Sequence, residues 1–518
     1  MAKRKRDVAD KGGAAQALKS RREEIVAPPK QAAAKSKDGA VQGTATATMG
    51  KAPSVSAAIA TDAESESTTV QIITGSYERV LHGFAATIPR SLVTGQHDAA
   101  IATESEDSKV DFTDTFLFNA HASAIRCLAL SPLSEDTSKV MLATGATDER
   151  INLYSLSTAP PAPSKSQPRL PSLHGASITE NPKNKELGSL LHHSSNITAL
   201  YFPTRSKLLS AAEDSTVAIT RTRDWTALST IKAPIPKPQG RPSGDTAGPG
   251  EVPSGVNDFA VHPSMKLMVS VGKGEKCMRL WNLVTGKKAG VLNFGRDILS
   301  AVGEGRFGSG EGRRVIWDKE GEEFAVAFER GVVVFSIDSK PKAKIAPTPR
   351  TKIHQMHYLP SDSHPTLLLV STEDGRVMLF DTSDTLPNSE GPSKDDIPSS
   401  RLVAQIGGPA AGITGRVKDF EILPLSPSDS ANFLIVTGSS DGTIRMWHLD
   451  TTELNGDVKA DQGKGFTARQ VARLLGTYKT GTRVTCLKAF VMTGTPDTEE
   501  EEVVAEKSAD SSSGDDSE

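Results

Sequence analysis

The chain has 518 residues, of which 37% are hydrophobic and only 5% aromatic, with 43 Gly and 31 Pro, so we expect a large folded body diluted by loops. The formal net charge of −3 is the sum of a basic N-terminal end and an acidic C-terminal end. Three widely separated cysteines argue against a disulfide framework or a structural zinc site, and no apolar run is long enough to span a bilayer. We therefore expect an intracellular protein in a reducing compartment.

Residues 1–66 are rich in Ala, Lys, Ser and Thr and contain almost no large apolar side chains, so we expect a disordered basic tail. Two basic clusters in this tail, KRKR and KSRR, are separated by a 12-residue spacer. This layout is typical of a bipartite nuclear import signal, whereas a solvated tail or an RNA-contacting arm are the alternatives. The import residues would be Lys3, Arg4, Lys5, Arg6, Lys19, Arg21 and Arg22.

From residue 67 to residue 492 one four-strand pattern recurs, which predicts an all-β domain. A short strand is followed by a β-rich run that ends in a turn, then by a strand with an aromatic residue, then by a fourth strand. A four-stranded sheet cannot cover its own two faces, so the units must stack on one another. The first strand of the pattern is expected at 125–130, 197–202, 256–261, 314–318, 353–358, 417–422 and 484–489.

Three stretches rich in Pro, Gly and Ser interrupt the pattern, near 158–187, 233–255 and 383–400, and we expect them to be surface insertions. Residues 493–518 are acidic and rich in Ser, which predicts a second disordered tail. This tail is either a solubilising segment or a site of phosphorylation.

The repeated units resemble the WD-repeat family, most clearly in VTGSSDGTIRMWHLD, LVSTEDGRVMLFD and VSVGKGEKCMRLWNL. The resemblance implies a β-propeller of four-stranded blades. Counting the strands gives seven blades, and the unpaired strands at the two ends of the pattern predict a ring closed by N- and C-terminal strands. In this family Asp, His and Trp residues form a hydrogen-bonded network inside each blade. The matching positions are His121, Asp148, Asp214, Trp281, Asp374, Asp441 and Trp447.

Two short motifs in the sequence are typical of enzymes. Gly438 to Gly442 fits G-x-S-x-G, which in a hydrolase places a nucleophilic serine between a strand and a helix, but the residues that follow, TIRMWHL, alternate as a strand does. The G-x-G-x-x-G match at 303–308 also leads into an expected strand, which disfavours a dinucleotide site. We find no catalytic constellation, metal site or cofactor site in the sequence, and expect a protein that is not an enzyme.

The segments GSYERVLHGF and VNDFAVHPS with RLWNLVTGKKA look like the p21-activated-kinase-interacting protein family, whose fungal members are known as maintenance-of-killer proteins. The resemblance implies a nucleolar assembly factor for the 60S ribosomal subunit. Such a factor binds pre-60S particles, helps to install an L24-like placeholder protein and could contact rRNA. The alternatives are a negative regulator of a p21-activated kinase and, more remotely, a propeller enzyme. Candidate partner-binding residues at the mouth of the ring are Arg126, His354 and Lys418.

Overall fold

The computed structural model describes residues 67–93, 109–134, 137–161, 177–178, 181, 183–235, 254–304, 308–386, 397–426, 429–455 and 466–493. All of them belong to one compact unit, 63–518. The import signal and both expected tails lie outside these residues. In the described part of the chain no helix is long and apolar enough to cross a membrane.

The described chain forms six β-sheets, of which five contain a four-stranded antiparallel unit and one contains two such units. The first sheet has the order β29-β1-β2-β3-β7 and joins both ends of the described chain. Its strands are β1 (Ser67–Ser76), β2 (Val80–Pro89), β3 (Asp111–Asn119), β7 (Ser177–Ile178) and β29 (Val484–Val491). The next sheet contains β4 (Ile125–Leu130), β5 (Lys139–Ala146), β6 (Ile151–Ser157) and β8 (Lys185–Leu190).

Two further four-stranded sheets follow in chain order. One contains β9 (Ile197–Thr204), β10 (Lys207–Ala212), β11 (Thr216–Arg221) and β12 (Ala227–Lys232), and the other contains β13 (Val256–Val261), β14 (Leu267–Gly272), β15 (Cys277–Asn282) and β16 (Lys287–Asn293). The short helix α1 (Arg296–Ala301) comes next.

The eight-stranded sheet consists of two antiparallel halves joined by a single parallel pair, Lys344 with Ser399. One half contains β17 (Arg314–Trp317), β18 (Glu323–Ala327), β19 (Val332–Ser336) and β20 (Pro341–Ile345). The other half contains β21 (Ile353–Tyr358), β22 (Leu367–Thr372), β23 (Arg376–Leu386) and β24 (Ser399–Gly407). The last sheet contains β25 (Val417–Ser426), β26 (Asp429–Ser439), β27 (Thr443–Asp450) and β28 (Arg473–Lys479). Three 3-10 turns are short: η1 (Arg90–Leu92), η3 (Pro409–Ala411) and η4 (Thr451–Asn455).

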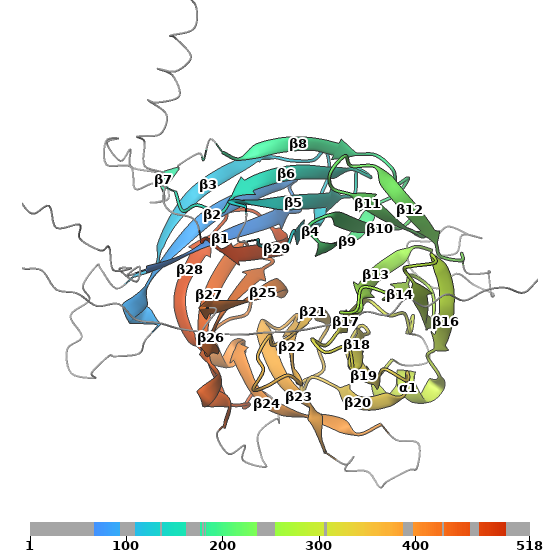
Figure 1. Ribbon diagram of the computed structural model, residues 1–518. Helices are drawn as coiled ribbons and strands as arrows, with labels where there is room; N and C mark the ends of the chain where they lie inside the picture. The colour runs from blue at the N-terminus through green and yellow to red at the C-terminus, as the bar shows by residue number, and fades with distance from the viewer. Residues whose placement is uncertain are drawn as a thin grey trace, which may run out of the picture. The chain divides into compact units, whose positions relative to one another are not determined.

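The sheets are arranged around a central axis, with β4, β9, β13, β17, β21, β25 and β29 innermost (Figure 1). Successive units follow the chain, except that β29 pairs antiparallel with β1, from Val70 opposite Val491 to Ser76 opposite Val484. This pairing joins residues that are more than four hundred positions apart in the sequence.

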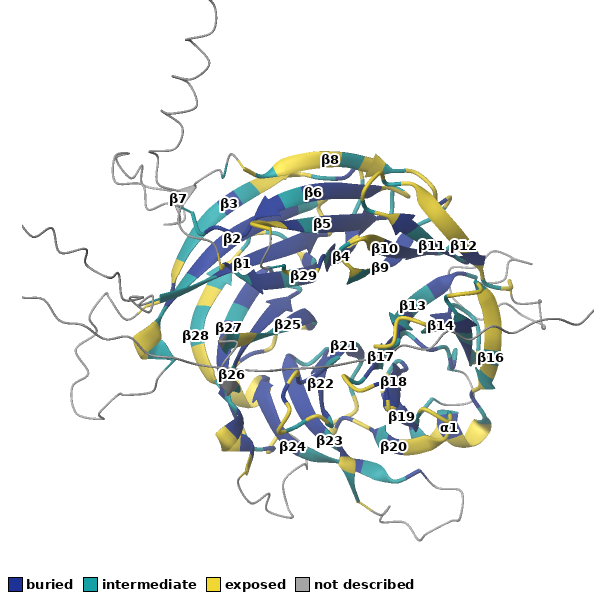
Figure 2. Ribbon diagram, viewed as in Figure 1, coloured by how far each residue is buried: buried dark blue, intermediate teal, exposed yellow. Residues whose placement is uncertain are grey.

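The apolar core lies between neighbouring sheets rather than inside any one of them. One cluster contains Leu209 and Val217 from the β9–β12 sheet together with Phe259 and Trp281 from the β13–β16 sheet, all buried. Figure 2 shows the same pattern, in which the middle strands are dark blue while β8, β12 and β16 at the outside are largely exposed. Stacking thus removes from water the two faces that a single sheet leaves open.

The all-β class and the four-stranded units predicted from the sequence are confirmed. The stretch expected as an insertion near 383–400 differs in detail, because β23 runs on to Leu386 and β24 begins at Ser399. Leu386 pairs with Ser399 and Thr385 with Ser400, so both ends of this stretch are strand. β8 likewise begins at Lys185, inside the insertion expected near 158–187.

Candidate binding surface at the channel mouth

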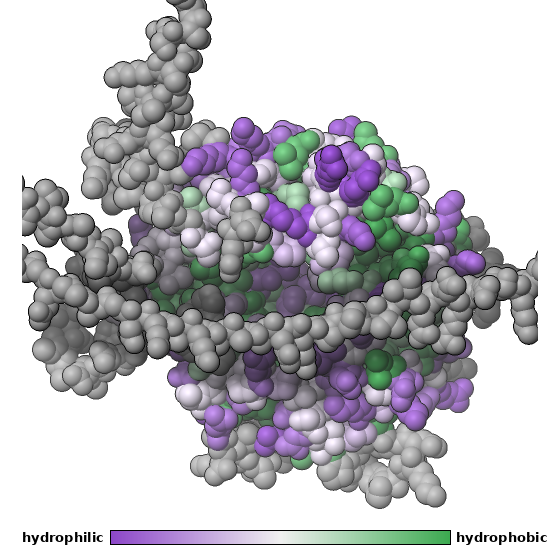
Figure 3. All heavy atoms as spheres, viewed as in Figure 1, coloured by the Kyte–Doolittle hydropathy of each residue, from purple (hydrophilic) through white to green (hydrophobic). Residues whose placement is uncertain are grey.

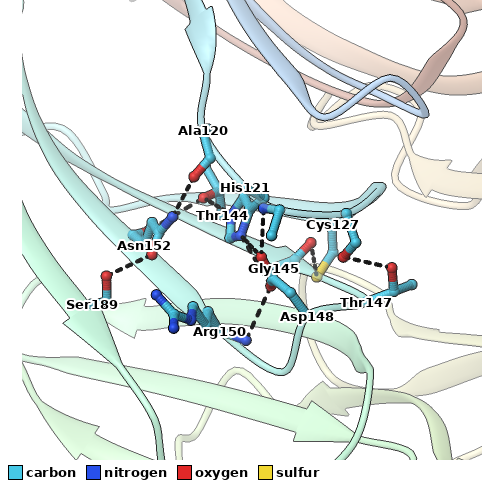
Figure 4. A network of polar contacts seen from close by, with 12 residues as sticks. Ala120, His121, Cys127, Thr144, Gly145, Thr147, Asp148, Arg150, Asn152 and Ser189 are labelled. Atoms are coloured by element: carbon cyan, nitrogen blue, oxygen red, sulfur yellow. Dashed lines mark hydrogen bonds and ion pairs between the residues drawn. The ribbon is translucent and has the colours of Figure 1, made fainter.

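A polar network lies beneath the turn between β5 and β6 (Figure 4). The side chain of His121 is fully buried, and its Nδ1 lies 3.1 Å from an oxygen of Asp148 while its Nε2 lies 2.7 Å from Oγ1 of Thr144. The Asp148 carboxylate also accepts a hydrogen bond of 2.9 Å from the backbone N–H of Ala122. Asp148 therefore ties the turn to the segment that leads into β4, and its charge is used to hold the sheet together.

The β9–β12 sheet contains an equivalent network, built on His193. Its Nδ1 lies 3.1 Å from Asp214, and its Nε2 lies 2.8 Å from Oγ of Ser210. Burial alone would raise the pKa of Asp214, but hydrogen bonds from His193 and from Thr216 outweigh burial and lower the pKa. A carboxylate held in its charged form by neighbours in the same sheet is suited to structure rather than to proton transfer.

The two tryptophans predicted to be structural occupy the same position in their units. Trp281 on β15 donates its indole N–H to Oγ of Ser270 at 2.8 Å, and Trp447 on β27 donates to Oγ1 of Thr437 at 3.2 Å. Both rings are buried, and Trp447 packs in a cluster that also contains Leu379 of the preceding unit. Each ring therefore satisfies its polar atom inside its own sheet and fills the space between sheets.

The two remaining predicted aspartates shape turns. Asp374 forms a two-pronged ion pair with the fully buried Arg376, with the closest contact at 2.7 Å. Asp441 accepts a hydrogen bond of 2.9 Å from the backbone N–H of Thr443. Ser440 therefore lies in a tight turn between β26 and β27, and the helix that a nucleophile elbow requires does not follow.

The G-x-G-x-x-G match lies between α1 and β17, with residues 305–307 outside the described range. It therefore leads into a strand, as the sequence predicts, rather than into the helix that a dinucleotide site uses. Within the described residues, no group of three or more His, Cys, Asp and Glu side chains is placed to hold a metal ion.

The innermost strands surround a central channel with a cavity of about 610 Å³. All seven of these strands, β4, β9, β13, β17, β21, β25 and β29, contribute residues to its wall. In the face-on view of Figure 3, hydrophilic side chains predominate at the outer rim and hydrophobic ones are seen deeper in the molecule. The channel wall itself carries both charged and apolar side chains.

The three predicted partner-binding residues lie near the start of innermost strands, which defines the channel mouth. Lys418 on β25 and His354 on β21 are in contact, with 3.3 Å between Nζ and Nε2. Arg126 on β4 is not part of that contact, since it faces Glu213 at 3.9 Å, and both Arg126 and Lys418 line the channel cavity. The structure therefore joins two of the three residues directly and places the third on another strand of the same mouth.

The electrostatic state of the mouth is unusual. Burial, together with the charges of Lys418, Arg314 and Arg416, lowers the pKa of His354 to about 4. Burial and the charge of Arg416 also lower the pKa of Lys418, against the opposing influence of Glu373. Burial is the main cause of the lowered pKa of His354, and the neighbouring cations add to it. The cations beside His354, Lys418 among them, are groups that an anionic partner could contact.

Three further cations at the mouth were not predicted from the sequence. Lys352 contacts Glu329 at 2.9 Å, Arg313 lies 3.8 Å from the same carboxylate, and Arg416 contacts Glu373 at 3.1 Å. Their position in the sequence could have identified them, because each cation stands immediately before an innermost strand in three successive units. Aligning the units by their first strands would have shown this recurring basic position.

An ion pair lies deeper in the channel. Nζ of Lys488 on β29 is 2.6 Å from Glu421 on β25, and each side chain keeps about a fifth of its surface exposed, at 23% and 22%. Asp419 accepts a hydrogen bond of 2.9 Å from the backbone N–H of Leu487. Burial raises the pKa of Glu421 even though Lys488 opposes the shift. These contacts join the first and last sheets across the channel wall.

Comparison with known proteins gives a consistent result. The family model described as "WD domain, G-beta repeat" matches residues 184–220 and 424–448. The chain is 24% identical to a p21-activated protein kinase-interacting protein 1-like protein of Xenopus laevis, over 82% of this chain and 83% of that protein. It is 27% identical to Protein MAK11 of Saccharomyces cerevisiae, over 74% and 78% respectively. A shorter match, 26% identical over 34% of this chain and 42% of the relative, is to Shk1 kinase-binding protein 15 of Schizosaccharomyces pombe.

Proposed function

We propose that this WD-repeat protein, a homologue of the p21-activated protein kinase-interacting proteins and of MAK11, is a non-catalytic scaffold that acts in assembly of the 60S ribosomal subunit. In this proposal it binds pre-60S particles, helps to install an L24-like placeholder protein and contacts rRNA. The binding role is carried by one observation, the channel mouth at which Lys418 contacts His354 and forms no ion pair with a carboxylate of the described residues. The assignment to 60S assembly is supported by the family resemblance of the sequence.

The scaffold proposed here is a closed ring of seven blades. The eight-stranded sheet counts as two blades, since its halves share only one parallel pair, and the other five sheets count as one blade each. The antiparallel pairing of β1 with β29 supports closure by the two ends of the pattern. A closed ring leaves few unpaired strand edges and keeps the loops at fixed positions, which suits the binding of several partners.

The partner at the mouth is proposed to be an acidic protein segment. Lys418 has no carboxylate partner among the described residues, and Arg126 lies 3.9 Å from its only one, so both cations can accept a new acidic group. A flexible acidic segment entering the channel would bury apolar wall at the same time, as protein interfaces generally do.

The cellular location follows from the same proposal. The basic clusters between Lys3 and Arg22 would direct the chain to the nucleus, and work on early 60S precursors would place it in the nucleolus. Fusing residues 1–30 to a fluorescent protein tests the import step by itself. Nuclear accumulation of the fusion that is lost when KRKR is changed to alanines would support the import signal. A fusion that is diffuse throughout the cell with or without the change would contradict it.

A second candidate function is regulation of a p21-activated kinase, which is favoured by the name of the Xenopus laevis relative, and the Schizosaccharomyces pombe relative is likewise named as a kinase-binding protein. Affinity purification of the full chain, followed by identification of co-purifying proteins and RNA, distinguishes the two functions. Recovery of 60S assembly factors and precursor rRNA is the expected result. Recovery of a kinase without any ribosomal precursor would replace the 60S proposal with the kinase proposal.

A further inference from the structure

A second positive surface lies at the opposite end of the innermost strands. The antiparallel strands of each unit place the turn after the first strand beside the turn after the third strand. In the β9–β12 sheet these are the β9–β10 and β11–β12 turns, joined by hydrogen bonds from Thr222 to the backbone carbonyls of Ser206, at 3.0 Å, and Arg205, at 2.8 Å. In the β13–β16 sheet, the N–H of Leu283 donates to the carbonyl of Lys266 at 2.8 Å.

The two pairs of turns are adjacent in space. A Cβ added to Gly286, in the β15–β16 turn, would lie 3.8 Å from Oγ of Ser229 on β12. The four turns and the strand ends that flank them carry seven cationic side chains and a single carboxylate, that of Asp224. We call this surface the basic turn patch. Its cations are Arg205, Lys207, Arg221, Arg223, Lys266, Lys287 and Lys288.

Only one of these cations is neutralised by the carboxylate. Arg221 forms a two-pronged pair with Asp224 and is exposed. Lys207, Arg223 and Lys287 are exposed and make no ion pair among the described residues. Exposed cations without ion-pair partners repel one another, and here they are held close together on two pairs of turns. An extended polyanion that bound there would reduce this repulsion.

The basic turn patch borders an acidic turn of the next unit. The carbonyl of Gly321, in the β17–β18 turn, lies 3.2 Å from Nε2 of His262 in the patch-side β13–β14 turn. That neighbouring turn carries Asp318, Glu320 and Glu322 with only one lysine. A polyanion is therefore attracted to the β9–β16 half of this face and repelled at its border, which gives the surface a defined extent.

A side chain suited to a nucleobase lies on β9, the strand that leads into the β9–β10 turn. Tyr201 is 43% exposed and lines the channel cavity together with Met265, which is 42% exposed and belongs to the β13–β14 turn of the patch. Phosphates need distributed point charges, and bases need an accessible ring on which to stack. A surface that offers both is more suited to single-stranded nucleic acid than to an acidic protein segment, which needs an apolar anchor in a pocket.

We infer that the basic turn patch binds a single-stranded RNA segment, with its phosphates over the β9–β10, β11–β12 and β15–β16 turns and a base on Tyr201. The inference names the surface that would make the rRNA contact of the proposed function. It rests on the proposed function only for the identification of the RNA as rRNA. The acidic-partner mouth and the RNA patch then lie on opposite faces, so the ring can hold a protein and an RNA at the same time.

The test uses the full chain and a fluorescein-labelled, unstructured RNA of about 20 nucleotides, which exceeds the site size of a single binding surface. The triple variant Lys207→Glu, Arg223→Glu, Lys287→Glu should bind the RNA about tenfold more weakly at moderate salt. The slope of log affinity against log salt concentration should become shallower by about 0.7 for each lost phosphate contact. Tyr201→Ala should weaken binding without changing the salt slope. The matched control Lys232→Glu reverses an exposed charge at the other end of β12 and should bind like the wild type.

Two readouts separate the patch from the basic tail and from a protein ligand. Cross-linking with thiouridine-containing RNA should label peptides that contain residues 201–225 or 265–288. Labelling confined to residues 1–66, an unchanged affinity of the triple variant, or stronger binding of a polyglutamate peptide than of RNA would each overturn the inference. None of these outcomes touches the 60S proposal, because association with pre-60S particles is measured separately.

Discussion

Nζ of Lys418 lies 3.3 Å from Nε2 of His354, and no carboxylate of the described residues forms an ion pair with that ammonium group. Lys418 is therefore a cation beside a neutral histidine, because burial and the nearby charges lower the pKa of His354 to about 4. The carboxylates at the mouth form ion pairs with other cations, Glu329 with Lys352 and Glu373 with Arg416, which leaves Lys418 to a partner.

The pKa of His354 should report the charge of Lys418. In Lys418→Ala the His354 midpoint should rise toward the ordinary value near 6.5 without reaching it, because burial remains. The measurement is an NMR titration of histidines labelled with carbon-13, with His354 assigned from His354→Asn. Lys340→Ala, an exposed lysine in the β19–β20 turn, is the control and should leave the midpoint near 4. An equal midpoint in wild type and Lys418→Ala would contradict the proposed coupling.

The same histidine makes stability depend on pH. The unfolded chain protonates His354 near pH 6.5, whereas the folded chain does so only near pH 4, so between these values the unfolded state binds more protons. Stability should therefore fall as the pH is lowered from about 6.5 to about 4. Urea unfolding at pH 7 and pH 5 should show a smaller loss for His354→Asn than for the wild type. Equal losses would show that other groups account for the whole effect.

Gly442 should be irreplaceable in the β26–β27 turn. It has φ of 82°, and an added Cβ would lie 2.6 Å from the carbonyl oxygen of Thr482. Gly442→Ala should therefore destabilise the protein by about 2–3 kcal/mol, from the left-handed backbone and from the clash. The control Gly481→Ala also has a left-handed φ, of 71°, but meets nothing within 4 Å and should cost only about 1 kcal/mol. Equal shifts of the urea midpoint in Gly442→Ala and Gly481→Ala would mean that Gly442 does not lie close to the Thr482 carbonyl in solution.

Asp148 should contribute to stability through His121. In Asp148→Ala the buried imidazole loses its Nδ1 partner and the Ala122 N–H loses its acceptor, at a cost of about 1–3 kcal/mol. Asp224→Ala instead breaks an exposed pair with Arg221 and two exposed hydrogen bonds from Thr226. Because water can replace these exposed partners, the effect on thermal unfolding should be smaller. If Asp224→Ala were the more damaging of the two, the network under the β5–β6 turn would not be the stabilising one.

The channel pair should show coupling across the first and last sheets. Lys488→Met leaves Glu421 without its cation, and Glu421→Gln leaves Lys488 without its carboxylate, so each should cost about 1–3 kcal/mol. The double variant should cost less than the sum of the two, because neither partner is then left alone. The free energies come from urea unfolding, and strict additivity would show that the pair contributes nothing.

The innermost strands were the most predictable elements. The expected segments 125–130, 256–261 and 353–358 coincide with β4, β13 and β21, since short β-rich runs bounded by turn residues determine strands locally. The turn at Ser440 was predicted for the same reason. The seven-blade count stays a proposal, because it counts the eight-stranded sheet, whose halves share one parallel pair, as two blades.

The site was less predictable. His121 and Asp148 could be found because the family motif names them, whereas Arg313, Lys352 and Arg416 carry no motif of their own. Their role depends on stacking, which brings residues from different units to one mouth. The unpaired state of Lys418 is also a tertiary property, since nothing in the sequence tells which carboxylates lie within reach.

The proposed role of the protein as a scaffold on pre-60S particles, held through its channel mouth, is tested most directly by sedimentation of cell extracts through a sucrose gradient. The full-length wild type is compared with the double variant Arg126→Glu, Lys418→Glu and with the control Lys340→Glu. The wild type and the control should sediment with 60S precursors, and the double reversal should move to the light fractions while remaining folded. A wild-type protein found only in the light fractions, alongside intact precursors, would contradict the claim.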